Sequence, residues 1–442
     1  MALDLQEVSI KLYDACASET VMLLDWSPKD PDSTTLVDFQ VSVTLSGISG
    51  YKSKFNLNKD NFVHVISLME SVLGARNQIL LGYNFKPFCS LYKKMSGRVF
   101  DIKRMYDLFW YESYLRIESS AGNFAKAISH FKSWIKDKTL HDIYQKIYKP
   151  LIVNVLPCIE STKVINDDLG KFVFSNYHVE GQENGRLSCS CEKKNSFNPH
   201  SLGEEKKHLK INYGDVKKYI LQYDYKNMEV GVLACLSKDK NLLDIINSPE
   251  NNVYGKIFES ITKISNSEDS KNLGKKMFLP LIYGQSYTGL SKTLNISTDQ
   301  AEIYYNNAVA NFNQSFGFVE HAQLQVKKDG HLFDCFGRKR IFDSAESYKA
   351  RNFVVQSPAA LICIEALIKL YKQSSNLFSV VFHVHDGYFI ITEGKNLQDA
   401  HHVAKTVLES KTDLLPDLNL KVATQVGTCL EKMVPLNQKK ER

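Results

Sequence analysis

The segment that decides the fold is Tyr219-Ile-Leu-Gln-Tyr-Asp-Tyr225, a run of apolar and aromatic residues that carries one aspartate. A second run of this kind, Ser379-Val-Val-Phe-His-Val-His-Asp-Gly387, lies far downstream. Both runs are rich in β-branched and aromatic residues and therefore predict β-strands. A carboxylate is costly to bury in such a strand unless a cation pairs with it. Asp224 and Asp386 therefore suggest the carboxylate pair of a two-cation site.

Each aspartate also has a simpler structural explanation when it is considered alone. Asp224 precedes a change to helical spacing, with Met228 and Val232 on one stripe and Glu229 beside it, so it is also a candidate helix cap. Asp386-Gly387 between two β-rich runs is a common hairpin-turn pair. The interpretation as a carboxylate pair therefore depends on the residues between them.

The intervening sequence predicts a helix with a basic and then an aromatic face. Ser265-Asn-Ser-Glu268 has the spacing of a capping box and would open this helix. Successive i+4 steps then place on one face Lys271, Lys275, Leu279 and Tyr283. Ammonium groups suit phosphates and a tyrosine ring suits a base, although a solvated lysine stripe that grades into the core is common in amphipathic helices. Pro280 should bend or end the helix because it has no N–H for the carbonyl of Lys276.

Composition limits the class of protein without deciding its function. At 442 residues and 43% hydrophobic, the chain can form two or three domains, and its net charge of +6 fits nucleic-acid binding as well as many other functions. Nine scattered cysteines indicate a reduced intracellular protein, expected in the cytoplasm, or in the host cytoplasm if the protein is viral. The N-terminus lacks the pattern of a signal peptide, and no uncharged apolar run reaches membrane-spanning length.

The patterns divide the chain into three regions. Residues 1–115 alternate strand and helix patterns, which suggests an α/β domain. Residues 116–170 are lysine-rich and helical, with one face formed by Phe124, Ile128, Phe131 and Trp134. Residues 171–442 alternate strands and helices irregularly.

The order of several short motifs carries a family resemblance. The first four are Gly185-Arg-Leu-Ser188, Asp224-Tyr-Lys-Asn-Met-Glu229, Lys275-x3-Leu279-x3-Tyr283-Gly284 and Val384-His-Asp386. Three more are Phe336-Gly-Arg-Lys-Arg340, Asn352-x3-Gln356-Ser-Pro-Ala-Ala360 and Val434-Pro-Leu436. Together, over roughly residues 171–436, they resemble the ordered motifs of family A DNA polymerases, the DNA polymerase I type. The chain looks like a small phage- or mobile-element-like member with a degenerate exonuclease domain.

The resemblance implies an α+β multidomain fold. It would be a right-hand polymerase with an antiparallel-sheet palm and helical fingers over residues 171–442 and a short helical thumb over 116–170. A ribonuclease-H-like α/β exonuclease-like domain would precede them at residues 1–115.

The N-terminal motifs differ from those of an active 3′-5′ exonuclease. Met22-Leu-Leu-Asp-Trp-Ser27 lies where Asp-x-Glu belongs, Gly82-Tyr-Asn-Phe-Lys-Pro-Phe88 lies where Asn-x-Lys-x-Asp belongs, and Val99-Phe-Asp101 is similar to the following Phe-Asp. Ser27 and Phe88 thus replace two metal-binding carboxylates, so the resemblance implies a domain without proofreading. Asp30 or Asp32 could substitute only through a shifted loop.

For the palm and fingers, the resemblance implies a role for each matching residue. Asp224, the backbone carbonyl of Tyr225, and Asp386 would bind two Mg²⁺ ions. Lys275 would hold the triphosphate and protonate the leaving pyrophosphate, and Lys271 stands where an arginine is usual. The remaining nucleotide-binding positions are Glu229 at the sugar 2′ position, Leu279 near the 3′ position, and Tyr283 beside the templating pair. The positions that would contact DNA are Arg186, Asn352 and Gln356 in the minor groove and His385 at the primer terminus.

The implied function is template-directed DNA synthesis by two-metal phosphoryl transfer to a primer 3′-hydroxyl, without proofreading. The implied partners are primer-template DNA and deoxynucleoside triphosphates, with no membrane partner. One alternative is a non-catalytic primer-template-binding subunit derived from a polymerase, since Gly387 replaces the usual second carboxylate. Another is a phosphohydrolase that uses His383, His385 and Asp386, because two imidazoles on one strand face would form a half-site for a transition metal.

Overall fold

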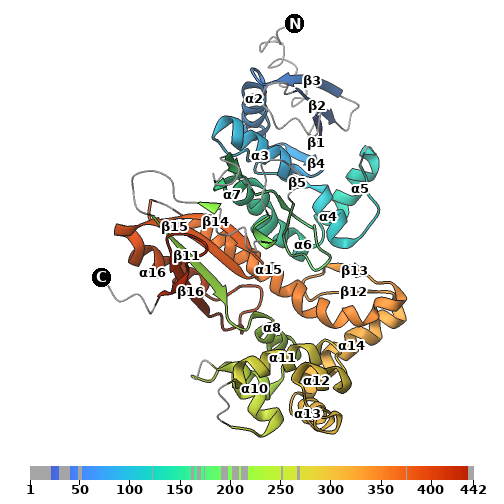
Figure 1. Cartoon of the computed structure of the whole chain (residues 1–442). Helices are drawn as coiled ribbons and strands as arrows, with labels where there is room; N and C mark the ends of the chain where they lie inside the picture. The colour runs from blue at the N-terminus through green and yellow to red at the C-terminus, as the bar shows by residue number, and fades with distance from the viewer. Residues whose placement is uncertain are drawn as a thin grey trace. The chain divides into compact units, whose positions relative to one another are not determined.

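In the computed structural model the described chain forms two compact units (Figure 1). The structure describes residues 21–28, 40–47, 52–121, 123–160, 164–166, 171–173, 175–190, 198–201, 209–210, 218–249, 252–265, 269–374 and 376–436. One unit comprises mainly residues 1–181 with 187–215, and the other mainly residues 216–428 with 182–186.

The first unit is built on a five-stranded sheet of order β3-β2-β1-β4-β5. Its strands are β1 (Val21–Pro28), β2 (Gln40–Gly47), β3 (Lys52–Asn58), β4 (Ile79–Gly82) and β5 (Met105–Asp107). The first three are antiparallel, whereas β4 pairs parallel to both β1 and β5. This mixed order is the ribonuclease-H-like arrangement that the resemblance implies.

Apolar side chains from the sheet and two helices form the core of this unit. The helices are α2 (Phe62–Ala75) and α3 (Phe85–Ser96). Phe88 is fully buried and lies edge-on to Phe62 and Phe100, with ring centroids 6.2 Å and 5.0 Å away. Aromatic pairs in this geometry add to the stability that burial provides.

The chain then continues as helices that share an aromatic core. They are α4 (Leu108–Leu115), α5 (Phe124–Trp134), α6 (Lys138–Ile143), η1 (Tyr144–Tyr148), η2 (Leu151–Val155) and α7 (Leu156–Glu160). Trp110 and Trp134 are buried, with ring centroids 5.4 Å apart. The expected buried face of residues 124–134 is confirmed for Phe131 and Trp134, which are both buried; the side chain of Phe124 lies outside the described part. The boundaries at residues 115 and 170 stay a prediction.

From Lys138 to Glu160 the helix is continuous but contains two wider turns. Lys149 N–H donates to Tyr144 O, and Leu156 N–H donates to Leu151 O, so each bond spans five residues instead of four. Pro150 and Pro157 follow these donors directly and cannot donate a backbone hydrogen bond. The π-type turns therefore accommodate the two prolines, and the helix continues past both of them.

Short strands complete the first unit. β6 (Val164–Asn166) pairs with β7 (Lys171–Val173) and β10 (Leu209–Lys210), and β8 (Tyr177–His178) pairs with β9 (Ser188–Cys189). A 3₁₀ turn, η3, spans Pro199–Ser201.

The second unit contains an antiparallel sheet of order β14-β15-β11-β16-β17. The strands are β11 (Lys218–Tyr225), β14 (Ser379–Val384), β15 (Gly387–Glu393), β16 (Val422–Gly427) and β17 (Val434–Pro435). A 3₁₀ turn, η6 (Gly394–Asn396), follows β15 and leads into α16 (Leu397–Leu408). Two helices, α15 (Ala350–Lys372) and α16, pack against this sheet. The helical segment that ends with α15 is long and apolar enough to cross a membrane, but most of it is buried inside the protein, as in the core helix of a globular domain.

Between β11 and α15 lies the helical part of this unit. Its helices are α8 (Met228–Ser237), α9 (Lys240–Ile246), α10 (Val253–Thr262), α11 (Ser270–Ile282), α12 (Tyr287–Leu294), α13 (Thr298–Asn311) and α14 (Asn313–Asp329). A hairpin of β12 (His331–Phe333) and β13 (Lys339–Ile341) follows, and a 3₁₀ segment, η5 (Ser344–Lys349), leads into α15. These helices and the sheet correspond to the expected fingers and palm.

Candidate active site

The fold brings Asp224 and Asp386 to the same end of the palm sheet. Asp224 is the next-to-last residue of β11 and pairs directly with Gly387 of β15. Asp386 lies in the turn just before β15, where its backbone oxygen accepts a 3.3 Å hydrogen bond from Tyr225 N–H. The structure therefore places these two aspartates and the Tyr225 backbone side by side, as the sequence suggested.

The turn that carries Asp386 differs from the predicted Asp-Gly turn. Val384 pairs with Gly387, so the two turn residues are His385 and Asp386, and Gly387 already belongs to β15. His385 supplies the left-handed conformation, with φ of +56°. A Cβ at Gly387 would lie 3.2 Å from Val384 O and 3.5 Å from Asp224 Oδ1. Glycine at this position therefore avoids a tight contact with the Val384 carbonyl and does not form the turn, whereas a Cβ would meet Asp224 at an ordinary contact distance.

Both carboxylates are in surroundings that disfavour their charge. Partial burial raises the pKa of Asp224 to about 6; the charge of Asp386 adds to this shift, and the ammonium group of Lys275 opposes it. Burial also raises the pKa of Asp386, although its own backbone N–H, Arg186 and His385 lower it. Asp224 keeps contact with solvent, so a soluble ion can reach it.

This donor set fits divalent cations. Among the described residues, neither Asp224 nor Asp386 forms an ion pair. No cationic side chain therefore contacts the two carboxylates and neutralises their mutual repulsion. Oxygen ligands are those that Mg²⁺ prefers. Within the described ranges, no group of three or more His, Cys, Asp or Glu side chains comes together as a metal site. The site therefore offers two carboxylates and a backbone carbonyl, consistent with glycine at position 387.

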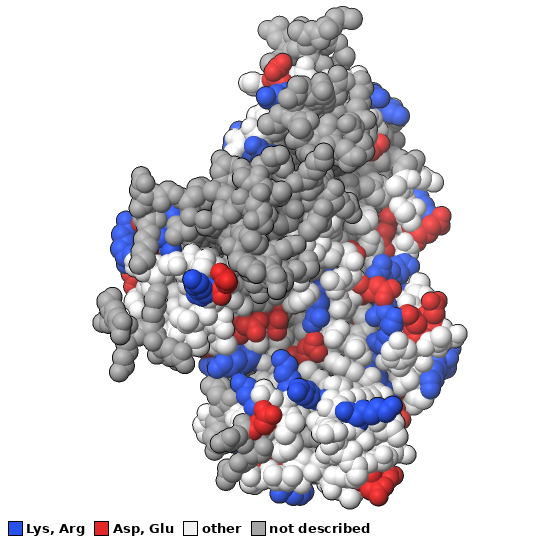
Figure 2. All heavy atoms as spheres, in the orientation of Figure 1, with Lys and Arg blue, Asp and Glu red and all other residues white. Residues whose placement is uncertain are grey.

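The helix between the aspartates presents the expected face. Lys271 and Lys275 of α11 are exposed, and Leu279 and Tyr283 further along the same face are half-buried. The charge of Lys275 lowers the pKa of Asp224, although its ammonium group forms no ion pair with that carboxylate. In Figure 2, Lys and Arg side chains gather over the helical part of this unit, with acidic side chains beside them.

The end of this helix agrees with the expectation that Pro280 bends or ends it. α11 ends two residues later, at Ile282, and Pro280 O accepts a hydrogen bond from Gln285 N–H. The expected capping box lies largely outside the described residues, and the described helix begins at Ser270.

Glu229 connects three segments of the site. Its carboxylate accepts a 2.8 Å hydrogen bond from Arg186 Nη2 and, on the other oxygen, a short hydrogen bond from the Tyr283 hydroxyl. Burial and the Glu229 charge raise the pKa of Tyr283, so its hydroxyl remains a donor. A charged acceptor held by two donors has a fixed position. Beside it lies a small cavity of about 20 Å³, room for about one water, which is lined by Arg186, Met228, Glu229, Ala359, Ala360, Cys363, His385 and Asp386.

The predicted DNA-contacting residues are only partly brought together. Asn352 and Gln356 lie one turn apart on α15, both half-buried. Gln356 Oε1 accepts a 3.4 Å hydrogen bond from Asn184 Nδ2, which ties α15 to the loop that carries Arg186. His385 is exposed at the turn next to Asp386.

Tyr254 is a further residue near the site that the sequence analysis does not predict. Tyr254 of α10 is 6% exposed. Burial is the main cause of its raised pKa, and the charges of Glu229 and Asp386 raise it further, so the Tyr254 hydroxyl lies within the electrostatic range of both. A single tyrosine in an amphipathic helix carries no signal that separates it from ordinary core residues.

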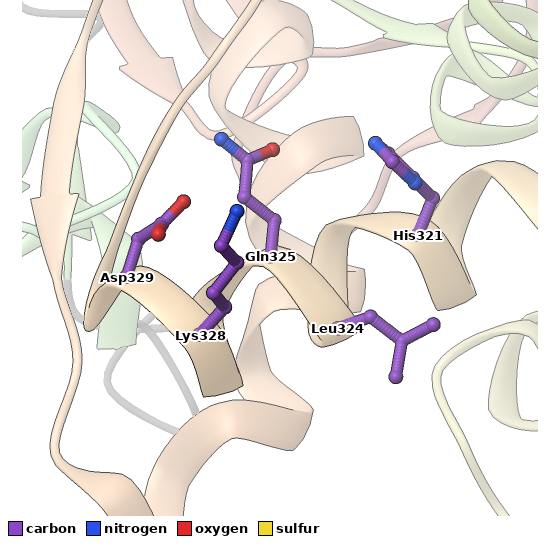
Figure 3. Close-up of a pocket in the computed structure, with 5 residues that line it drawn as sticks. All are labelled: His321, Leu324, Gln325, Lys328 and Asp329. Atoms are coloured by element: carbon purple, nitrogen blue, oxygen red, sulfur yellow. The ribbon is translucent and has the colours of Figure 1, made fainter.

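Two other candidate sites do not fit the chemistry. His383 is buried against Tyr388 while His385 is exposed in the turn, so the two imidazoles do not share a face as expected, and the transition-metal half-site is wrong. A larger hollow of about 420 Å³ lies on α14, where all lining residues shown in Figure 3 come from one helix: His321, Leu324, Gln325, Lys328 and Asp329. It has a single carboxylate and lacks the converging groups of a catalytic site.

Comparison with known proteins decides the family. The model of the family "DNA polymerase family A" matches residues 136–432, about two thirds of the chain. The chain belongs to DNA polymerase family A.

Curated relatives agree with this family. DNA polymerase I of Pseudomonas aeruginosa is 26% identical over 242 residues, which cover 50% of this chain and 26% of that protein. DNA polymerase I of Caldicellulosiruptor bescii is 24% identical over 285 residues, 60% of this chain and 33% of that protein. DNA polymerase theta of Drosophila melanogaster is 26% identical over 251 residues, 48% of this chain and 11% of that protein. The matched region thus spans a third or less of each of these relatives.

A solved structure confirms the fold class. The polymerase domain of Pol1 from M. smegmatis, in complex with DNA primer-template and dNTP, superimposes with a TM-score of 0.74 at 14% identity. The match covers 97% of this chain and 99% of that chain. The family A chain therefore has the right-hand polymerase fold over nearly its whole length.

Among the described residues of the N-terminal unit, few carboxylates lie where an exonuclease needs them; Asp30 and Asp32 lie outside the described residues. Asp25 is exposed on β1, Ser27 follows two residues later on the same strand, and Phe88 is in the core. Asp101 lies in the loop before β5, and Asp107 ends the strand next to β4. Asp107 is buried and accepts hydrogen bonds from the N–H groups of Asn84, Phe85 and Phe109, so it serves as a structural cap.

Proposed function

We propose that this chain catalyses template-directed DNA synthesis, adding deoxynucleotides to a primer 3′-hydroxyl by two-metal phosphoryl transfer. The observation that carries the proposal is the meeting of Asp224 and Asp386 at one end of the palm sheet. The charge of Lys275 on α11 also acts on Asp224. Membership of DNA polymerase family A supports it, as does the fold shared with a polymerase that holds primer-template and dNTP.

The carboxylates of Asp224 and Asp386 and the carbonyl of Tyr225 are the groups that would hold two Mg²⁺ ions. Bound there, the ions would supply charge neutralisation at the phosphates and a lower pKa for the attacking hydroxyl. The protein contributes position: both carboxylates are fixed by a paired strand and a two-residue turn, and their mutual repulsion favours cation binding.

The exposed lysines of α11 would bind the triphosphate. The charge of Lys275 acts on Asp224, so we expect its ammonium group to meet the phosphates near the carboxylates. There it would also be the acid that protonates the departing pyrophosphate. Lys271, one turn earlier, would add charge attraction without contacting the reacting groups. Leu279 and Tyr283, on the same face, would pack against the sugar and the base pair.

Glu229 would select deoxyribose by excluding a 2′-hydroxyl. Arg186 and Tyr283 fix its carboxylate from two sides, so it cannot turn away to admit an extra hydroxyl. A rigid obstacle of this kind discriminates by repulsion rather than by attraction.

Arg186, Asn352 and Gln356 would contact the minor groove of the nascent pair. The minor-groove acceptors are nearly the same for every correct base pair, so donors at fixed positions can test pair geometry without reading sequence. His385, exposed next to Asp386, would support the primer terminus.

Primer extension tests this function directly. The purified chain, given a primer-template, all four deoxynucleotides and Mg²⁺, should lengthen the primer, and a chelator should stop the reaction. Binding of the duplex with no extension at any divalent ion concentration would favour the non-catalytic primer-template-binding subunit instead.

A further inference from the structure

We infer that Arg338 is a positioning residue for Arg186: it contacts neither DNA nor nucleotide but fixes the loop that aims Arg186 at the minor groove. This inference rests on the proposed function of Arg186. Arg338 lies in the turn of the β12–β13 hairpin, outside every residue assigned a role above.

The loop before Arg186 is a tight turn packed against Arg338. Gly185 N–H donates to Gln182 O at 2.9 Å, and Arg186 N–H donates to Asn184 Oδ1 at 3.2 Å. Gly185 has a φ of +74°, and a Cβ there would lie 2.6 Å from Arg338 Cζ and Nη2. The guanidinium plane therefore lies directly on the glycine backbone, an approach that no larger residue permits.

A buried aspartate fixes Arg338 in turn. Asp334 is 7% exposed, and its Oδ1 accepts 2.9 Å hydrogen bonds from the N–H groups of Phe336 and Arg338. Its other oxygen accepts a 2.6 Å hydrogen bond from Ser357 Oγ on α15. Because Ser357 directly follows Gln356, the hairpin is tied to the helix segment that carries the second predicted minor-groove residue.

Two further contacts hold the same loop. Arg340 forms a short ion pair with Glu183 and also lies 4.6 Å from the ring centroid of Phe342. Asn184 donates to Gln356. Arg338 is only 3% exposed, so it is enclosed by protein, whereas Arg186 reaches the small cavity beside Asp386. The loop 182–186 is thus held by the hairpin and by α15, and Arg186 reaches from it into the site.

The test uses a primer whose terminal guanine is replaced by 3-deazaguanine, which lacks the minor-groove N3 acceptor. The measured quantity is the ratio of kcat/KM for extending the normal and the modified primer. Wild-type protein should prefer the normal primer about tenfold or more, and Arg186→Ala should reduce the ratio to about one. Arg338→Ala should also bring it close to one, and the double variant should show no additional loss.

Matched variants separate positioning from folding. Lys339→Ala, on the same hairpin, should retain the wild-type ratio. Gly185→Ala disturbs the same contact from the loop side and should lower the ratio like Arg338→Ala. It replaces Arg338→Ala as the test if Arg338→Ala unfolds at a lower temperature than the wild type. Arg338→Lys should not restore the ratio, because an ammonium group has no plane to lie on the glycine.

The outcomes are distinct. A wild-type ratio in Arg338→Ala, or independent losses in the double variant, would overturn the positioning role while leaving polymerase function intact. If the active wild-type enzyme has a ratio of one, Arg186 does not contact the minor-groove N3 of the primer terminus, and the inference about Arg338 is wrong. Absence of extension by wild-type protein would instead contradict the proposed function.

Discussion

The carboxylate of Glu229 forms a 2.8 Å ion pair with Arg186 Nη2, and its second oxygen is bonded to the Tyr283 hydroxyl. Three segments far apart in the chain meet at this one side chain: the loop 182–186, the start of α8 and the end of α11. The pair is part-buried, so solvent screens it less than a surface ion pair. We therefore expect the sugar-selecting group and the minor-groove group to respond to mutation together.

Glu229→Ala should admit ribonucleotides, because it opens space at the sugar 2′ position. It should also lower the rate with deoxynucleotides, since Arg186 and Tyr283 lose their shared acceptor. The measurement is the ratio of kcat/KM for ribo- and deoxynucleotides. Glu229→Gln keeps the volume and should preserve most of the discrimination. An unchanged ratio in Glu229→Ala would show that the choice of sugar is made elsewhere.

Removing the charge of Asp224 should stabilise the metal-free protein. The pKa of Asp224 is raised to about 6 in the folded chain, above its usual value of 3.8, so the ionised form opposes folding at neutral pH. Stability from this group is therefore gained as pH falls through about 6. Asp224→Asn should raise the free energy of unfolding by on the order of 1 kcal/mol at pH 7.5, allowing for solvent screening.

Urea unfolding in the presence of a chelator measures this effect. The gain in Asp224→Asn should shrink as pH is lowered from 7.5 to 5, and Mg²⁺ should stabilise the wild type but not the variant. Asp244→Asn, an exposed aspartate on α9, provides the control and should show neither change. A difference in unfolding free energy that does not change with pH would mean that the pKa of Asp224 is not raised in the folded protein.

Lys275→Ala should shift the acid limb of the pH–rate profile. Because the Lys275 ammonium group lowers the pKa of Asp224, its removal should raise that pKa and cause activity to be lost at a higher pH. The KM for nucleotide should rise as well. Lys271→Ala should raise KM without moving the limb, since Lys271 is not among the groups that shift the Asp224 pKa. Equal shifts in both variants would contradict the placement of Lys275.

A 3′-mismatched primer should survive incubation with the protein and Mg²⁺ when nucleotides are withheld. In the N-terminal unit Phe88 is in the core, and Asp107 is used as a cap, so few carboxylates remain to bind cations. Gel analysis of the primer measures this. Rapid trimming that Asp25→Ala abolishes and Asp386→Ala does not would show that the domain is active.

Local sequence patterns predict the strands and helices of the site better than they predict the contacts between those elements. Strand β11 and the lysine face of α11 follow from residue periodicity, which depends only on neighbours along the chain. Asp386-Gly387 predicts a turn at these two residues, whereas the turn residues are His385 and Asp386 and Gly387 already belongs to β15. Pro280 predicts a bend or an end of the helix, and α11 ends two residues later.

Contacts between distant segments could not be predicted from spacing. Nothing in the sequence around Gly185 indicates that Arg338 lies on it, or that Glu229 has two donors. The sequence around Asp107 likewise does not indicate that this residue ends the strand paired with β4, because that pairing is decided across the sheet. Such pairings depend on the packing of the whole unit.

The measurement that tests the central claim most directly compares extension and binding in two variants. Asp224→Ala and Asp386→Ala should each abolish primer extension in Mg²⁺ while duplex affinity stays within a few-fold of wild type, because affinity rests mainly on phosphate contacts. Asp244→Ala should extend normally. If either palm variant extends a primer at near wild-type rate, these aspartates are not the metal-binding pair and the proposed mechanism is wrong.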